Sequence, residues 1–150
     1  MTVTPHRRSA VVVDTGPLVA LINANDEHHA ACVEWLTRAL ARRRKLIIPM
    51  PIVTEVCYLL GTTAGSDAEA NFLDELARTP ADFRLFSPGR SDLARMARLV
   101  RKYADLPLGA ADAAVIATAE RFETTEIATI DDRMAKVVRL NDREPILAVP

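Results

Sequence analysis

Short apolar runs alternate with longer stretches of helical periodicity along the whole chain. The runs have the length of β-strands and cover residues 10–14, 45–49, 82–86, 126–130 and 145–149. The first run is apolar and β-branched up to its closing acid, which is typical of a strand buried on both faces of a parallel sheet. The pattern therefore predicts strands that lie inside the protein.

The stretches between these runs carry helix signals. We expect helices over residues 18–23, 26–43, 52–60, 66–78, 91–103, 108–122 and 132–140. Gly61 is a plausible helix end, and Ser66 to Glu69 forms a capping-box pattern. Strands separated by helices favour an α/β fold of three layers, α/β/α, around a central, mostly parallel sheet of four to five strands. The length of 150 residues suits a single domain over 1–150.

Hydropathy and cysteine content favour a cytoplasmic protein without a membrane segment. No apolar stretch approaches the roughly 20 residues that span a bilayer. Asp14 interrupts the apolar run after Ser9 far too early for a signal-peptide core. Cys32 and Cys57 fall in apolar helical patterns, so we expect them to be reduced and packed as small hydrophobic residues.

The net charge of −1 carries little information, but most of the basic residues are arginines. They form two clusters, Arg42–Lys45 and the group Arg90, Arg95, Arg98, Arg101 and Lys102. Arginine side chains match phosphate oxygens, so either cluster is a candidate path for nucleic acid. A solvated helix face explains each cluster equally simply, and both interpretations stay open.

Four acids fall at matching ends of the predicted elements. Asp14 closes the first strand, Asp131 follows the fourth, and Glu55 and Asp112 stand in the first turns of helices. Ligands in α/β proteins bind beyond the carboxyl ends of the strands, so the four can converge in one cleft. Taken singly, each could be a helix cap or an exposed helix acid.

The chemistry of such a group points to a metal ion. Four neighbouring carboxylates repel one another, and in the sequence only Arg133 lies close to one of them. Hard divalent cations such as Mg²⁺ and Mn²⁺ prefer oxygen ligands of this kind. The sequence therefore predicts a divalent-metal site.

The four acids lie within motifs that resemble those of the PIN domain, and within it the VapC-type toxins of bacterial toxin–antitoxin pairs. The matching stretches are Val11–Leu21, Pro51–Val56, Tyr103–Ala113 and Ala128–Arg133. The likeness extends from about Val11 to Val149. One departure is visible, because Met134-Ala135 stands where the fourth motif of the family often has an aromatic residue.

The resemblance implies a divalent-metal-dependent endoribonuclease in which Asp14, Glu55, Asp112 and Asp131 bind one or two Mg²⁺ or Mn²⁺ ions. Asp105 fits a frequent acidic position, where it would bind metal, support the site or only cap a helix. Thr15 and Thr129 look like hydroxyls that hold water or acids in place.

The resemblance also implies partners: an RNA substrate, a small antitoxin and a second copy of the chain in a homodimer. The apolar helix segments Val19–Ile22 and Val53–Leu60 are candidate surfaces for the antitoxin, although either could instead be core or dimer surface.

Three rival interpretations deserve a test. The tripeptide Asp14-Thr-Gly also follows apolar residues in aspartic proteases, but those are all-β proteins. A response-regulator receiver needs a lysine after a late strand, whereas Lys136 falls in a predicted helix. A PIN-like domain can also be a binding scaffold without catalysis, and a scaffold would typically lack some of the acids that this chain retains.

Overall fold

The computed structural model describes residues 10–150, so the basic N-terminal residues His6, Arg7 and Arg8 lie outside the described part. A sheet of five parallel strands occupies the centre, in the order β3-β2-β1-β4-β7. Its strands are β1 (Ala10–Val13), β2 (Lys45–Pro49), β3 (Phe83–Phe86), β4 (Glu126–Ala128) and β7 (Leu147–Val149). The predicted sheet is confirmed.

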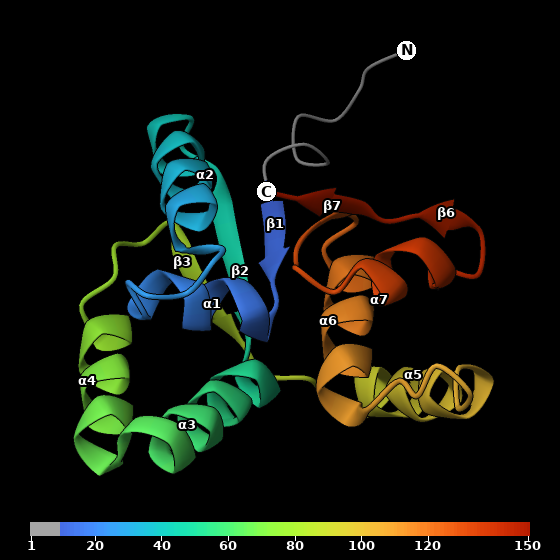
Figure 1. The fold of residues 1–150 in the computed structure, drawn as a ribbon. Coiled ribbons are helices and arrows are strands. Elements are labelled where there is room, and N and C mark those ends of the chain that lie inside the picture. The colour runs from blue at the N-terminus through green and yellow to red at the C-terminus, as the bar shows by residue number, and fades with distance from the viewer. Residues whose placement is uncertain (1–9) are drawn as a thin grey trace.

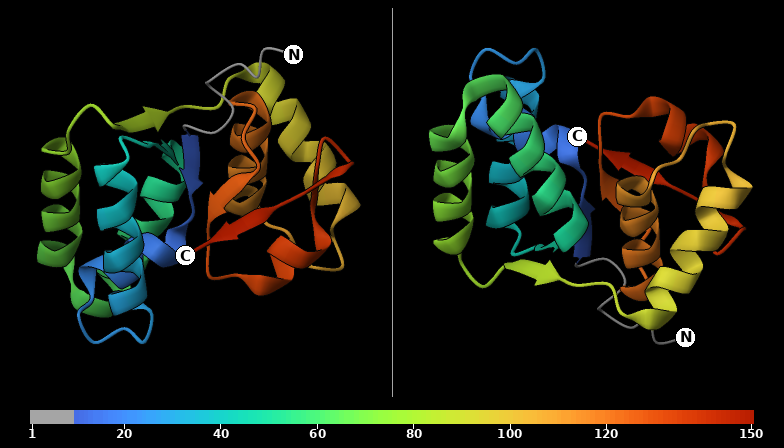
Figure 2. Two further views of the ribbon diagram at one scale, coloured as in Figure 1. Left: turned by 90° about the horizontal axis from the view of Figure 1, so that it is seen from above. Right: turned by 90° about the horizontal axis from the view of Figure 1, so that it is seen from below.

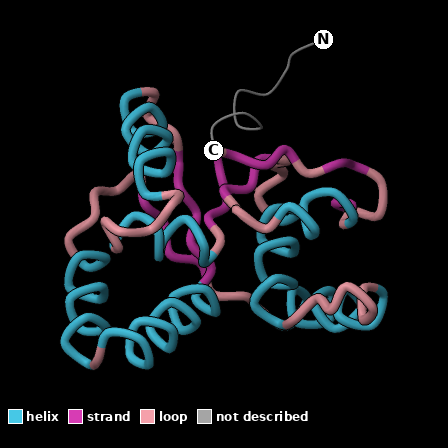
Figure 3. The backbone as a smooth tube through the Cα atoms, viewed as in Figure 1, coloured by secondary structure: helices cyan, strands magenta, loops and turns pink. Residues whose placement is uncertain are grey.

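Helices cover the sheet from two sides, as Figures 1 and 2 show from three directions. One group is α1 (Thr15–Ile22), α2 (His29–Ala41), α3 (Met50–Ala64) and α4 (Ser66–Ala77). The other is α5 (Arg90–Lys102), α6 (Ala110–Arg121) and α7 (Asp132–Val137). Figure 3 separates the strands in the middle from the helices beside them. The predicted three-layer α/β/α arrangement is therefore confirmed.

The core forms where α6 lies against the central strands. Val11, Val12 and Val13 of β1 are almost fully buried, and so is the whole run Ala113–Ala119 of α6. Small alanine side chains let the helix approach β1 closely, and burial of apolar surface on both sides stabilises the pair. This packing fixes α6, which carries Asp112 near its first turn.

The boundary between α3 and α4 differs from the prediction. The helix does not end at Gly61 but continues to Ala64, and Gly65 terminates it with a φ of 92°, a conformation that favours glycine. Gly61 instead lies where the two helices approach closely, since a Cβ there would lie 2.7 Å from Oε2 of Glu69. The glycine signal therefore reflects helix packing.

The C-terminal region also differs. The predicted helix 132–140 ends at Val137, and two short antiparallel strands follow, β5 (Arg139–Leu140) and β6 (Glu144–Pro145). Asn141 and Asp142 have positive φ in the turn between these strands, as asparagine and aspartate tolerate. Strands of two residues are too short to leave a periodic signal in the sequence.

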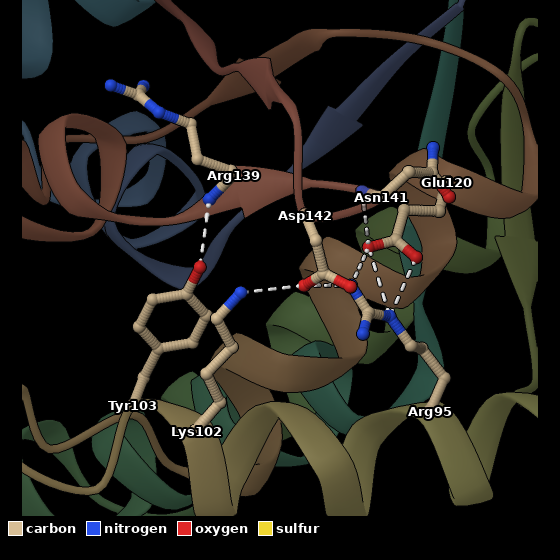
Figure 4. Close-up of polar contacts among 7 residues, drawn as sticks. All are labelled: Arg95, Lys102, Tyr103, Glu120, Arg139, Asn141 and Asp142. Atoms are coloured by element: carbon tan, nitrogen blue, oxygen red, sulfur yellow. Dashed lines mark hydrogen bonds and ion pairs between the residues drawn. The ribbon is translucent and has the colours of Figure 1, made fainter.

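A network of charged side chains ties this hairpin to α5 and α6 (Figure 4). The Arg95 guanidinium donates to both carboxylate oxygens of Glu120, and its Nη2 lies 3.4 Å from Oδ1 of Asp142. Lys102 binds the same oxygen at 2.9 Å, and the backbone N–H of Asn141 donates to Glu120. Because Arg95 and Glu120 are largely buried, this network holds the hairpin against both helices.

Cys32 and Cys57 are buried free thiols, as expected, and burial raises the pKa of each. Within residues 10–150, no helix combines the length and the apolar character that crossing a membrane would require.

Candidate functional site

Asp14 is the most deeply buried of the four predicted acids, with 5% of its surface exposed. It follows β1 and caps the N-terminus of α1, where one carboxylate oxygen accepts from the backbone N–H of Thr15 at 2.8 Å. The other oxygen accepts from the hydroxyl of Thr129 at 2.8 Å. The carboxylate is thus held in one orientation by β4 and α1 together.

The environment of Asp14 disfavours its charge. Burial raises the pKa of Asp14 to about 6, although the hydrogen bonds from Thr15 and Thr129 act in the opposite direction. The negative charges of Asp112 and Glu55 raise this pKa further. A buried carboxylate of this kind is stabilised when a cation binds beside it.

Glu55 enters the site from α3 and is half-buried. The hydroxyl of Thr15, at the start of α1, donates a hydrogen bond to Oε2 of Glu55. Thr15 therefore contacts two acids, because its backbone N–H binds Asp14 and its side chain binds Glu55.

Asp112 and Asp131 complete the group from the other side of the sheet. Asp112 is the third residue of α6 and accepts from the N–H of Gly109 at 3.4 Å. Burial raises the pKa of Asp112, and the charges of Glu55 and Asp131 add to this effect. Asp131 caps α7 by accepting from the backbone N–H groups of residues 133 and 134. The cap and the site are compatible roles.

The structure brings the four acids within electrostatic reach of one another, since Asp14 and Asp112 each respond to the charges of neighbours in the group. Within residues 10–150, none of the four forms an ion pair with a lysine, arginine or histidine. A group of carboxylates without a basic partner has the donor chemistry that Mg²⁺ and Mn²⁺ prefer.

The oxygens do not yet point to one common centre. In the described part of the chain, no three His, Cys, Asp or Glu side chains are arranged closely enough to hold an ion together. The reason is visible in the contacts, because oxygens of Asp14, Glu55 and Asp112 accept hydrogen bonds from the protein itself. The donor set fits a divalent cation, and small side-chain rotations would have to complete its shell.

The other predicted site residues separate into two kinds. Thr129 does more than expected, since its hydroxyl binds Asp14 and also accepts from the backbone N–H of Asp131 at 3.0 Å. It thus links the first and fourth acids. Asp105 is exposed in the turn between α5 and α6 and is not among the groups that shift the pKa of Asp14 or Asp112. The structure does not bring Asp105 into the group.

Gly16 is a site feature that the sequence analysis missed. A Cβ at this position would lie 2.4 Å from Cγ1 of Ile130, so the start of α1 and the loop between Thr129 and Asp131 touch here. The signal was present as the glycine directly after Asp14-Thr15, but only the fold identifies what packs against it.

The two candidate partner surfaces are only partly available. In Val53–Leu60, the apolar residues Val53, Val56 and Leu60 belong to the core, while Tyr58 is 68% exposed beside the exposed Leu59. In Val19–Ile22, the large side chain of Ile22 is exposed. The parallel sheet also rules out the all-β aspartic protease fold.

The raised pKa values predict how the stability of the metal-free protein depends on pH. The pKa of Asp14 is about 6 in the folded protein against 3.8 for the free side chain, so the folded state binds the proton more tightly. The free energy of unfolding should therefore fall as pH rises from about 4 to about 6, with Asp112 contributing in the same direction. Urea unfolding in the presence of a chelator at pH 4.5, 5.5 and 7 checks this. An Asp14→Asn variant that shows the same fall as the wild type would contradict it.

Comparisons with known proteins agree with this geometry. The sequence model described as the PIN domain matches residues 11–140. The chain is 34% identical over 129 residues to Ribonuclease VapC26 of Mycobacterium tuberculosis, covering 86% of this chain and 92% of the relative.

Two solved structures share the fold. The first is VapC20 of Mycobacterium tuberculosis, described as a sarcin–ricin loop cleaving toxin, with a TM-score of 0.70 at 18% identity over 85% of this chain and 95% of that one. The second is VapBC2 of Rickettsia felis bound to a DNA fragment from its promoter, with a TM-score of 0.67 at 13% identity over 94% and 99% of the two chains.

Proposed function

Because this chain belongs to the PIN-domain family, we propose that it is a divalent-metal-dependent endoribonuclease, the toxin of a toxin–antitoxin pair, acting in the cytoplasm. The observation that carries the proposal is the group Asp14, Glu55, Asp112 and Asp131. These acids come from four separate elements, lie within electrostatic reach of one another and have no basic partner among the described residues. The name of the Mycobacterium tuberculosis relative supports the choice of RNA as substrate.

The four acids would hold one or two Mg²⁺ or Mn²⁺ ions, which when bound supply activation of water and neutralise charge at the phosphodiester. The protein contributes orientation. Thr15 and Thr129 hold the oxygens of Asp14 and Glu55, and Thr129 also fixes the loop of Asp131. Without counter-ions, the four carboxylates would repel the RNA backbone, so the acids make substrate binding depend on metal.

RNA cleavage in Mn²⁺ tests this proposal. We expect the purified protein to cut RNA in Mn²⁺ and to lose the activity when a chelator is added. Asp112→Asn should reduce the rate by at least about 100-fold, since outer-shell changes alone commonly cost 10–100-fold in metal sites. Asp105→Asn is the matched control, because this exposed acid lies seven residues earlier and should leave the rate within about twofold. Cleavage that persists in the chelator or in Asp112→Asn would refute the site.

The same proposal includes two protein partners, an antitoxin and a second copy of the chain. The structure of the Rickettsia felis VapBC2 protein with promoter DNA supports an antitoxin that pairs with a chain of this fold. The exposed apolar side chains Ile22, Tyr58 and Leu59 offer contact area for such a partner. Light scattering of the chain alone, and with the product of the neighbouring gene, measures both assemblies.

A non-catalytic PIN-like scaffold is the alternative function. It predicts no binding of Mn²⁺, whereas the nuclease proposal predicts a calorimetric signal that Asp14→Asn abolishes. The deep burial of an unpaired Asp14 favours the nuclease, because a scaffold would gain stability by replacing it.

A further inference from the structure

The first arginine cluster is largely neutralised by the fold. Arg43 and Lys45 both pair with Asp82, and Arg44 pairs with Glu126 at 3.0 Å. These residues precede or begin β2, at the amino end of the strands, whereas the four acids lie at the carboxyl end. The cluster therefore has little free charge, and it lies at the edge of the sheet opposite the candidate site.

Cations on α7 and β5 are in a different situation. Arg133, Lys136 and Arg139 are exposed, and within residues 10–150 none of them pairs with a carboxylate. Asp132 is the one acid between positions 132 and 139, so three cations against one acid leave this segment with a net charge of +2.

This segment begins at the candidate site. Asp131 caps the helix, and Lys136 lies five residues further along, about 8 Å at the rise of an α-helix. The hydroxyl of Tyr103 accepts from the backbone N–H of Arg139 at 3.2 Å, which anchors this position to the end of α5. Figure 4 shows the Arg139 guanidinium extending away from Tyr103 and from the ion-pair network. Arg101, also exposed and without a carboxylate partner among the described residues, is two positions before Tyr103.

We infer that Lys136 and Arg139, continued by Arg101, form a binding path for the RNA backbone that leads to the acidic group. The inference rests on the proposed nuclease function and specifies the side from which substrate reaches the site. Exposed cations without internal partners lose no ion pair when they bind phosphate, whereas Arg43 and Lys45 would first have to leave Asp82. Contacts to phosphate raise affinity without reading sequence.

The test compares two double variants that remove the same charge. Lys136→Ala/Arg139→Ala should raise the KM for RNA cleavage by at least about tenfold, leave kcat within about twofold, and reduce the slope of log affinity against log salt by about 1. Arg43→Ala/Lys45→Ala should leave KM and the salt slope unchanged. Lys136→Arg/Arg139→Lys keeps both charges and should retain a KM near that of the wild type.

The outcomes separate the path from the proposed function. If the wild type cuts no RNA in Mn²⁺, the function itself fails. If the wild type cuts RNA and both alanine variants show its KM, the function stands and the path is refuted. The path is equally refuted if Lys136→Ala/Arg139→Ala weakens only the binding of an acidic protein partner, with KM unchanged. Because the mutated side chains are exposed, thermal unfolding should confirm that all variants fold.

Discussion

Replacing Asp14 with asparagine is expected to abolish RNA cleavage and, at the same time, to stabilise the metal-free protein. The pKa of Asp14 is about 6 in the folded state and 3.8 in the free side chain, so at neutral pH its charge destabilises the fold. Removing this charge should raise the free energy of unfolding by up to about 3 kcal/mol above pH 7. Asparagine retains an oxygen for the N–H of Thr15, so the cap of α1 survives.

Urea unfolding in a chelator, together with a cleavage assay in Mn²⁺, measures both effects of this substitution. Asp131→Asn is the matched control within the same group, because its side chain is less deeply buried and caps α7. It should lose activity without a comparable gain in stability. An Asp14→Asn protein less stable than the wild type in a chelator would contradict our description of this buried charge.

Thr129→Val should weaken Mn²⁺ binding and cleavage by roughly 10–100-fold, the range expected when an outer-shell partner of a metal ligand is lost. Valine has nearly the same shape but cannot donate to Asp14 or accept from the N–H of Asp131. Losing a hydrogen bond to a charged group also costs about 1.5–3 kcal/mol of stability. Without this donor, the pKa of Asp14 should rise, so protons compete more strongly with the ion.

The chain contains a natural control for this substitution at the other end of β4. Thr124 is also buried, and its hydroxyl donates to the backbone oxygen of Ala10 and accepts from the N–H of Glu126. Thr124→Val should therefore lower stability but leave Mn²⁺ affinity unchanged in titration calorimetry. Equal losses of affinity in Thr124→Val and Thr129→Val would mean that Thr129 acts only through general stability.

The sequence was most informative where elements are long or buried. The run Ala10–Val13 predicted a central strand because every side chain in it is apolar, and the order of strands and helices then predicted a parallel sheet with acids at one edge. Both features appear in the structure. The pattern was least informative at β5 and β6, which have two residues each and depend on a turn at Asn141 and Asp142.

The contacts within the site lay beyond the reach of sequence patterns. Nothing in the chain indicated that the hydroxyl of Thr15 would bind Glu55, 40 positions away, or that Thr129 would bridge Asp14 and Asp131. Charge pattern was equally ambiguous, because Arg43 and Lys45 look like an RNA surface until the fold places Asp82 beside them. Side-chain partners far apart in the sequence decide these features, and they emerge only from the fold.

A crystal structure determined from crystals grown in Mn²⁺, with anomalous data collected at the manganese edge, tests the central claim most directly. We predict an anomalous peak bounded by oxygens of Asp14 and of at least two among Glu55, Asp112 and Asp131. A map that shows the four carboxylates in their internal hydrogen bonds, with no peak between them at saturating Mn²⁺, would contradict the metal-dependent nuclease.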